Sequence, residues 1–156
     1  MTLTRRQFCS LALVLLVGCQ QASTSSPSTP TLPTAAVQLG NKTFTLEIAA
    51  NEENRERGLM RRDSMAADHG MIFVFPSPSN VGFYMKNTRI QLDIVFLDQA
   101  GGVISIKQMK PYDLSSTYAD GPAKWAIELN KDAASDAGLK VGDKVQIPES
   151  ARAAEP

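Results

Sequence analysis

The stretch GMIFVF at residues 70–75 decides the fold class of this chain. Five apolar residues follow Gly70 without interruption, a run too short for a buried helix and typical of a strand buried on both faces. Two prolines and an asparagine between residues 76 and 80 then turn the chain. We expect the apolar run at 81–85 to return beside this strand as its hairpin partner. The stretch therefore predicts a β-rich core.

The sequence on either side predicts further short strands and two small helices. The expected strands are residues 43–48, 91–97, 103–107, 125–129 and 144–147. The expected helices are residues 52–59, capped by Asn51, and residues 132–137. Residues 111–123 are interpreted as a polar loop. The pattern indicates an α+β fold, mainly antiparallel β, in which one compact barrel-like domain with two short helices spans residues 36–148.

The N-terminus has the three parts of an export signal. A basic head with Arg5 and Arg6 precedes an apolar run at residues 11–17, which is shorter than the roughly 20 residues that span a bilayer. The tetrapeptide Leu16-Val17-Gly18-Cys19 resembles the lipobox of bacterial lipoproteins, in which the cysteine carries diacylglycerol. We therefore expect residues 1–18 to be a lipoprotein signal peptide. The basic head also resembles the twin-arginine motif, so the export route stays open.

This signal predicts where the protein lies in the cell. Lipid on Cys19 would hold the exported chain at a membrane of the cell envelope, on the periplasmic side. Gln20 follows the cysteine in place of an aspartate, which favours the outer membrane in a Gram-negative host. Residues 19–35 are rich in Ser, Thr and Pro and are interpreted as a disordered tether, and residues 149–156 as a disordered tail.

Composition excludes several classes of function. Removal of the signal takes away Arg5 and Arg6, so that 14 basic side chains face 16 acidic ones and nucleic-acid binding is disfavoured. Cys9 leaves with the signal and Cys19 is lipidated, so no thiol is left for a disulfide, a nucleophile or a metal site. The remaining methionines lie mostly in apolar runs, where core packing explains them better than copper binding. We expect no metal and no cofactor.

A series of motifs in fixed order resembles a known family. They are residues 56–61 (ERGLMR), 70–75 (GMIFVF), 83–88 (FYMKNT), 92–98 (LDIVFLD) and 128–130 (ELN), and residues 138–143 (GLKVGD) complete the order. Together they resemble the bacterial and archaeal family catalogued as domain of unknown function 192. The resemblance implies a compact, β-rich and frequently exported domain without an established activity. The chain departs from the family pattern at Tyr84, Arg89, Gln91 and Lys131.

Asp93 is the residue that most needs an explanation, because it lies inside an apolar strand. A buried carboxylate must be paired, hydrogen-bonded or protonated. One interpretation is a polar pocket in which Asp93, Asn87 and an arginine, Arg57 or Arg61, bind a small ligand. The other is a structural role, in which Asp93 fastens a loop by accepting hydrogen bonds from backbone N–H groups.

Two functions follow from these alternatives. The first is a non-catalytic accessory module of the envelope that binds a small ligand, a glycan or a partner protein, and the absence of a nucleophile–base motif favours it. The second is a hydrolase of an envelope polymer with Asp93 as acid or base. Glycoside cleavage uses two carboxyl groups, and Glu128 is the candidate for the second. The two functions differ in whether Asp93 and Glu128 face one open cleft.

Overall fold

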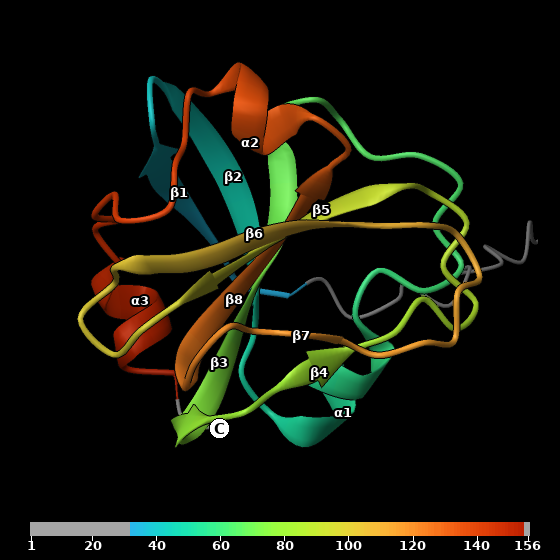
Figure 1. Cartoon of the computed structure of the whole chain (residues 1–156), viewed down its shortest axis with the longest axis horizontal. Coiled ribbons are helices and arrows are strands. Elements are labelled where there is room, and N and C mark those ends of the chain that lie inside the picture. The colour runs from blue at the N-terminus through green and yellow to red at the C-terminus, as the bar shows by residue number, and fades with distance from the viewer. Residues whose placement is uncertain (1–31, 155–156) are drawn as a thin grey trace, which may run out of the picture. The chain divides into compact units, whose positions relative to one another are not determined.

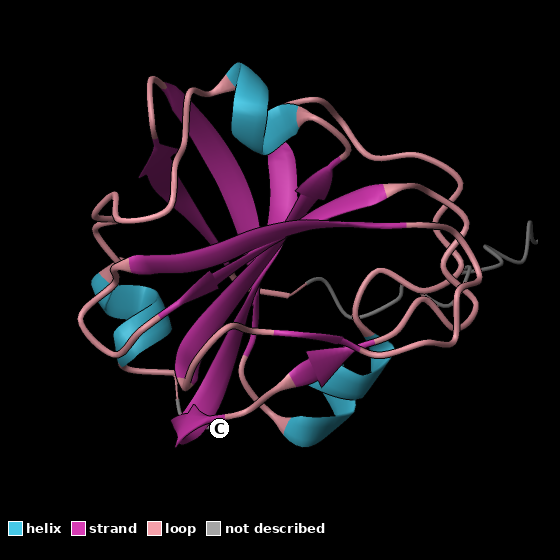
Figure 2. Ribbon diagram, viewed as in Figure 1, coloured by secondary structure: helices cyan, strands magenta, loops and turns pink. Residues whose placement is uncertain are grey.

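Six strands of this chain form one open sheet, shown in Figures 1 and 2. The structure is a computed structural model that describes residues 32–154. Its elements are β1 (Thr34–Leu39), β2 (Lys42–Ala49), α1 (Glu52–Arg57), β3 (His69–Ser79), β4 (Gly82–Phe83), β5 (Leu92–Leu97), β6 (Val103–Met109), β7 (Thr117–Tyr118), β8 (Ala123–Asn130), α2 (Ala133–Asp136) and α3 (Glu149–Arg152). The large sheet has the order β1-β2-β3-β8-β5-β6, and β4 pairs with β7 in a separate two-stranded sheet. None of the described helices is long and apolar enough to cross a membrane.

The large sheet is mixed, with one parallel pair. β2 and β3 run parallel, and the other neighbouring strands are antiparallel. A parallel pair needs a crossover between its strands, and here the segment with α1 provides it. Every residue of β5 is buried, because both faces of the sheet are covered.

Strand alternation divides the core into two layers, one on each face of the sheet. Val95, Ile127 and Leu129 belong to the layer that α2, α3 and the residues between them cover. Ile94 and Phe96 belong to the other layer, which α1 and the small sheet cover. The second layer includes Phe83 of β4, whose ring packs edge-on against Phe73 and Phe96 at centroid distances of 4.9 and 5.7 Å. Such edge-to-face contacts fix the small sheet on the large one.

The structure confirms a mainly β fold with short helices and corrects four details. The described strands do not close into a barrel, because β1 and β6 are edges of an open sheet. The expected hairpin partner at 81–85 does not pair with β3, since β4 pairs with β7 inside the expected loop 111–123. The expected strand at 144–147 forms only a bridge between Lys144 and Gly102. Part of the expected disordered tail, residues 149–152, is helix α3, which buries a small apolar side chain against the core.

The expected domain boundary at residue 36 also shifts. β1 begins at Thr34, and Leu32, the first described residue, is already buried in the core layer that contains Ile94 and Phe96. The expected signal peptide at 1–18 and the lipidation site at Cys19 lie outside the described residues, as does most of the expected tether.

Candidate ligand-binding site

A cleft of about 580 Å³ opens beside α1. Its lining residues come from α1, from the turn after it and from the segment after β4. They are Glu53, Glu56, Arg57, Met60, Arg61, Tyr84 and Lys86. Arg57 and Arg61, which the sequence proposed as ligand-binding residues, therefore face the same cleft. A volume of this size suits a small molecule.

The capping of α1 positions Arg57 at the cleft. The Asn51 side chain accepts a hydrogen bond from the Asn54 N–H at 2.9 Å and begins the helix. Gly58 ends it at a φ of 45°, a left-handed conformation that favours glycine. The Arg57 Nη2 group donates to the Asn54 side-chain oxygen at 2.8 Å, which holds the guanidinium along the helix. Leu59 is buried immediately after the helix and anchors its end.

Two non-glycine residues in left-handed conformation join the walls of the cleft. Arg61 has a φ of 63° and Asn87 a φ of 57°. The Arg61 N–H donates to the Asn87 carbonyl oxygen at 2.8 Å, so each residue holds the other in place. On the far side of the same segment, Tyr112, which also has a left-handed φ of 60°, donates its N–H to the Thr88 carbonyl oxygen at 3.2 Å. Backbone strain of this kind costs about 1–3 kcal/mol per residue and concentrates at functional sites.

The cationic groups of the cleft differ from Arg62 and Arg89 in that they form no ion pair with a described residue. Arg62 and Arg89 form ion pairs with Glu47 and Asp63. Within residues 32–154, none of the charged side chains that line the cleft forms an ion pair. Arg61 makes no side-chain hydrogen bond to any described residue, in contrast to the other arginines of that range. The cleft therefore presents guanidinium groups that are available to a ligand.

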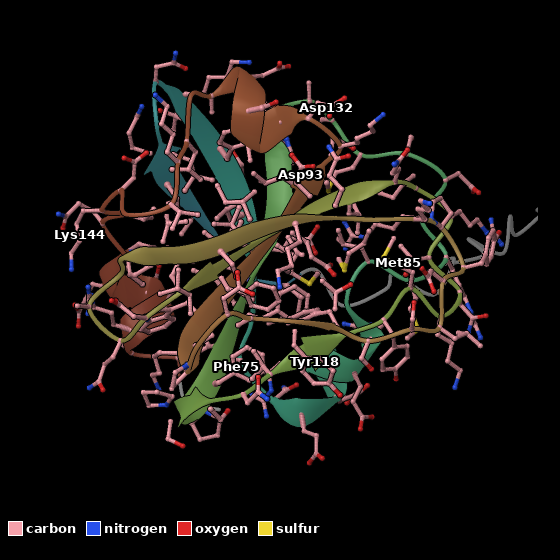
Figure 3. The ribbon with its side chains drawn as sticks, viewed as in Figure 1. Phe75, Met85, Asp93, Tyr118, Asp132 and Lys144 are labelled. Carbon is pink, nitrogen blue, oxygen red and sulfur yellow. The ribbon has the colours of Figure 1, made fainter. Side chains whose placement is uncertain are left out.

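Asp93 lies away from this cleft. It is on β5 with only 2% of its surface exposed, and its Oδ2 atom accepts a hydrogen bond from the Ala134 N–H at 3.0 Å. Figure 3 shows Asp93 beside α2, far from Tyr118. The expected arginine partner is therefore wrong: Asp93 fastens the start of α2, because α2 rather than α1 covers its face of the sheet. The second carboxylate oxygen, Oδ1, has no hydrogen-bond partner among the described residues.

Glu128 points to the opposite face of the sheet from Asp93. Asp93 pairs with Leu129 in the β5–β8 register, and Glu128 pairs with Ile94, so the two carboxyl groups differ by one step of the strand alternation. Glu128 is also buried, and its Oε2 atom has no hydrogen-bond partner in the described part of the chain. Its burial raises the pKa of Glu128 to about 8, and the positive charge of Arg62 only partly opposes this rise. The two carboxyl groups therefore do not face one cleft.

Arg62 covers the edge of the same face as Glu128. Its guanidinium binds both carboxylate oxygens of Glu47, at 2.5 and 2.7 Å. Arg62 reaches Glu47 because the chain folds back over β2 after α1. Lys86 and Tyr84 were not proposed as ligand-binding residues. The alternation of buried Met85 with exposed Tyr84 and Lys86 is the signal that could have identified them.

In residues 32–154, no three acidic or histidine side chains come together as a metal site would require. The cleft offers three cationic side chains and a tyrosine to a ligand, beside two glutamates. The arrangement suits an anion with a small organic body, because guanidinium groups bind carboxylate and phosphate oxygens in pairs.

Two solved structures resemble this chain over most of its length. A protein of unknown function from Novosphingobium aromaticivorans DSM 12444 is 31% identical, with a TM-score of 0.70, over 82% of this chain and 94% of that one. A protein from Sinorhizobium meliloti 1021, provisionally described as a transcription regulator, is 30% identical, with a TM-score of 0.67, over 71% of this chain and 89% of that one. No curated protein matches the sequence. Residues 35–147 match the family model DUF192, "Uncharacterized ACR". The chain therefore belongs to the DUF192 family.

Proposed function

We propose that this protein is a cell-envelope lipoprotein whose globular domain is a non-catalytic accessory module that binds a small anionic ligand in the cleft beside α1. One observation carries the proposal: Arg57, Arg61 and Lys86 line a single cleft without an ion pair to any described residue. They face Glu53 and Glu56, which leaves the lining with one excess positive charge. An anion that entered would gain the paired contacts that guanidinium groups form with carboxylates and phosphates.

The geometry does not favour the hydrolase alternative. Cleavage of a glycosidic bond needs two carboxyl groups that flank the bond. Asp93 is almost fully buried and bonded to the backbone of α2, and Glu128 lies on the other face of the sheet. Neither residue lines the cleft beside α1. The arrangement therefore does not support cleavage by Asp93 and Glu128, and we propose binding as the function of the cleft.

The envelope location rests on the N-terminal sequence. Gly18-Cys19 after a short apolar run, followed by a Ser, Thr and Pro tether, is the pattern of a lipidated exported protein. A diacylated cysteine contributes about 0.8 kcal/mol for each buried methylene, which holds a protein firmly at a membrane. The cleft would then meet ligands on the periplasmic side of the envelope.

The test is a titration of the protein with citrate and, separately, with inorganic phosphate, followed by amide chemical shifts. We expect shifts concentrated at residues 57–61 and 84–87, and an affinity for citrate that falls at least about tenfold in the double variant Arg57→Gln/Arg61→Gln. The matched control is Arg89→Gln, which removes an exposed arginine outside the cleft lining. Equal losses in the control and the double variant would show a general charge effect and would contradict the proposal, as would the absence of shifts with both anions.

A further inference from the structure

Most of the exposed large apolar side chains lie on one part of the chain. Among the described residues these side chains are Tyr84, Tyr112, Leu114, Tyr118 and Val141. All except Val141 belong to the small sheet or to the segments that continue from its strands. Three of them are tyrosines, whose rings combine an apolar face with a polar edge. This concentration points to a binding surface, because scattered single exposures need no explanation but a group does.

Tyr118 and Tyr84 stand on the same outer face of the small sheet. Gly82 pairs directly with Tyr118, and a side chain at Gly82 would meet the Tyr118 ring at 2.6 Å, so the ring lies over the glycine. Tyr84 directly follows β4, two residues after Gly82, and continued alternation places its exposed side chain on the side of Gly82, while Phe83 between them packs into the core. Figure 3 shows Tyr118 over β4, on the side of the molecule that carries α1. We call Tyr118 and Tyr84 the tyrosine face.

The tyrosine face continues into the cleft beside α1. Tyr84 belongs to both, since its side chain also lines the cleft. The small sheet and α1 are held together underneath, because Phe73 contacts Phe83 at a centroid distance of 4.9 Å and lies against the position of Gly58 at the end of α1. A ligand that extends from the cleft would therefore pass over Tyr84 and then Tyr118.

We infer that the tyrosine face and the cleft form one site for an acidic oligosaccharide. Sugar rings have a face of C–H groups that stacks on aromatic rings and an edge of hydroxyl groups. Tyr84 and Tyr118 would bind successive rings, and Arg57, Arg61 and Lys86 would bind a ring carboxylate. This inference rests on the proposed function and names the class of its ligand. An acidic glycan fits better than an acidic peptide because the Tyr118 ring lies over Gly82 and is half exposed, which offers a flat face for a sugar ring.

The experiment measures the affinity of the full-length protein for three probes by calorimetry. The probes are an oligogalacturonate, a neutral galacto-oligosaccharide of the same length, and an oligoglutamate of the same charge. We expect the oligogalacturonate to bind at least about tenfold more tightly than either of the others. Tyr118→Ala should weaken its binding about fivefold, as should Tyr84→Ala, because each removes one aromatic contact.

Two controls separate this inference from the proposed function. Tyr118→Phe keeps the ring and should bind the oligogalacturonate as the original protein does, and melting curves show whether each variant is folded. Tyr118 does not line the cleft, so Tyr118→Ala should bind citrate within about twofold of the original affinity.

Each other result overturns the inference. Undiminished oligogalacturonate binding in both alanine variants, with loss only in Arg57→Gln/Arg61→Gln, would limit the site to the cleft and leave the proposed function in place. Equal binding of oligoglutamate would identify an acidic peptide surface. If the neutral oligosaccharide bound as tightly as the oligogalacturonate, the cationic side chains of the cleft would have no role in binding. Absence of oligogalacturonate binding would also overturn the inference, and retained citrate binding would show that the proposed function still stands.

Discussion

The substitution Glu128→Gln should change how the stability of this protein depends on pH. Glu128 is buried on β8, its Oε2 atom has no partner among the described residues, and its burial raises the pKa of Glu128 to about 8 from an ordinary value of 4.5. Between pH 4.5 and 8 this carboxyl group is therefore ionised in the unfolded chain and protonated in the folded protein. Below pH 4.5 this group takes nothing from the free energy of unfolding. As the pH rises from 4.5 toward 8, the free energy of unfolding decreases, because only the unfolded state gives up the proton.

The size of the effect follows from the difference between the two pKa values. Each pH unit in this window costs about 1.4 kcal/mol of unfolding free energy, since the unfolded state alone gives up the proton. The loss reaches about 3 kcal/mol at pH 7 and about 4 kcal/mol at pH 8, where the folded group is itself half ionised. This is a large share of the stability of an ordinary domain, which is about 5–15 kcal/mol. Glutamine has the same shape and does not ionise, so the variant should lack this slope.

The assay is urea unfolding of both proteins at intervals from pH 4.5 to 8.5. The free energy of unfolding of the variant, relative to that of the original protein, should increase by about 1.4 kcal/mol per pH unit. This increase should stop near pH 8. The amide group can also change the free energy of unfolding by an amount that does not depend on pH, and such a change leaves the slope against pH unaffected. Glu56→Gln, at an exposed glutamate of α1, is the matched control and should give parallel curves. A constant difference between Glu128→Gln and the original protein across this range would refute the reasoning, because Glu128 would then be ionised in the fold.

Three further predictions concern the anchors of the fold and of the membrane. Asp93→Ala should lower the free energy of unfolding by about 1–3 kcal/mol and speed amide exchange at Ala134, because it removes the acceptor at the start of α2. Asp93→Asn keeps an acceptor and should cost less. Urea unfolding that shows no loss for the alanine variant would contradict the structural role. Arg62→Met should cost about 1–3 kcal/mol by leaving Glu47 without its two hydrogen bonds, and a double-mutant cycle with Glu47→Gln should show coupling; additive losses would count against the pair. Cys19→Ala should abolish incorporation of labelled palmitate and release the protein from the membrane fraction, and labelling that persists would disprove lipidation at this residue.

Local pattern was sufficient for much of the fold and for part of the candidate site. The uninterrupted apolar run at 71–75 and the run at 92–97, which is apolar except for Asp93, are strands whose residues are almost all buried, as their composition predicts. Asn51 caps α1 as expected, since a cap depends on residues only three apart. Phe83 packs into the core and the next residue, Tyr84, is exposed, which is the alternation that an extended segment requires. These features depend on neighbours in the sequence, and periodicity describes them directly.

The sequence by itself determined where most strands of the large sheet lie and which faces those strands bury, and its ordered motifs indicated the DUF192 family. Only the tertiary structure decided that β4 pairs with β7, that Asp93 meets the Ala134 N–H across 41 positions of the chain, and that Glu128 lies on the other face. It also brought Arg57 and Arg61 to one cleft with Lys86 and left Asp93 outside it. The reason is physical: alternation orients a side chain relative to its own strand, whereas its partner depends on which distant segment covers that face, and no local period encodes that choice.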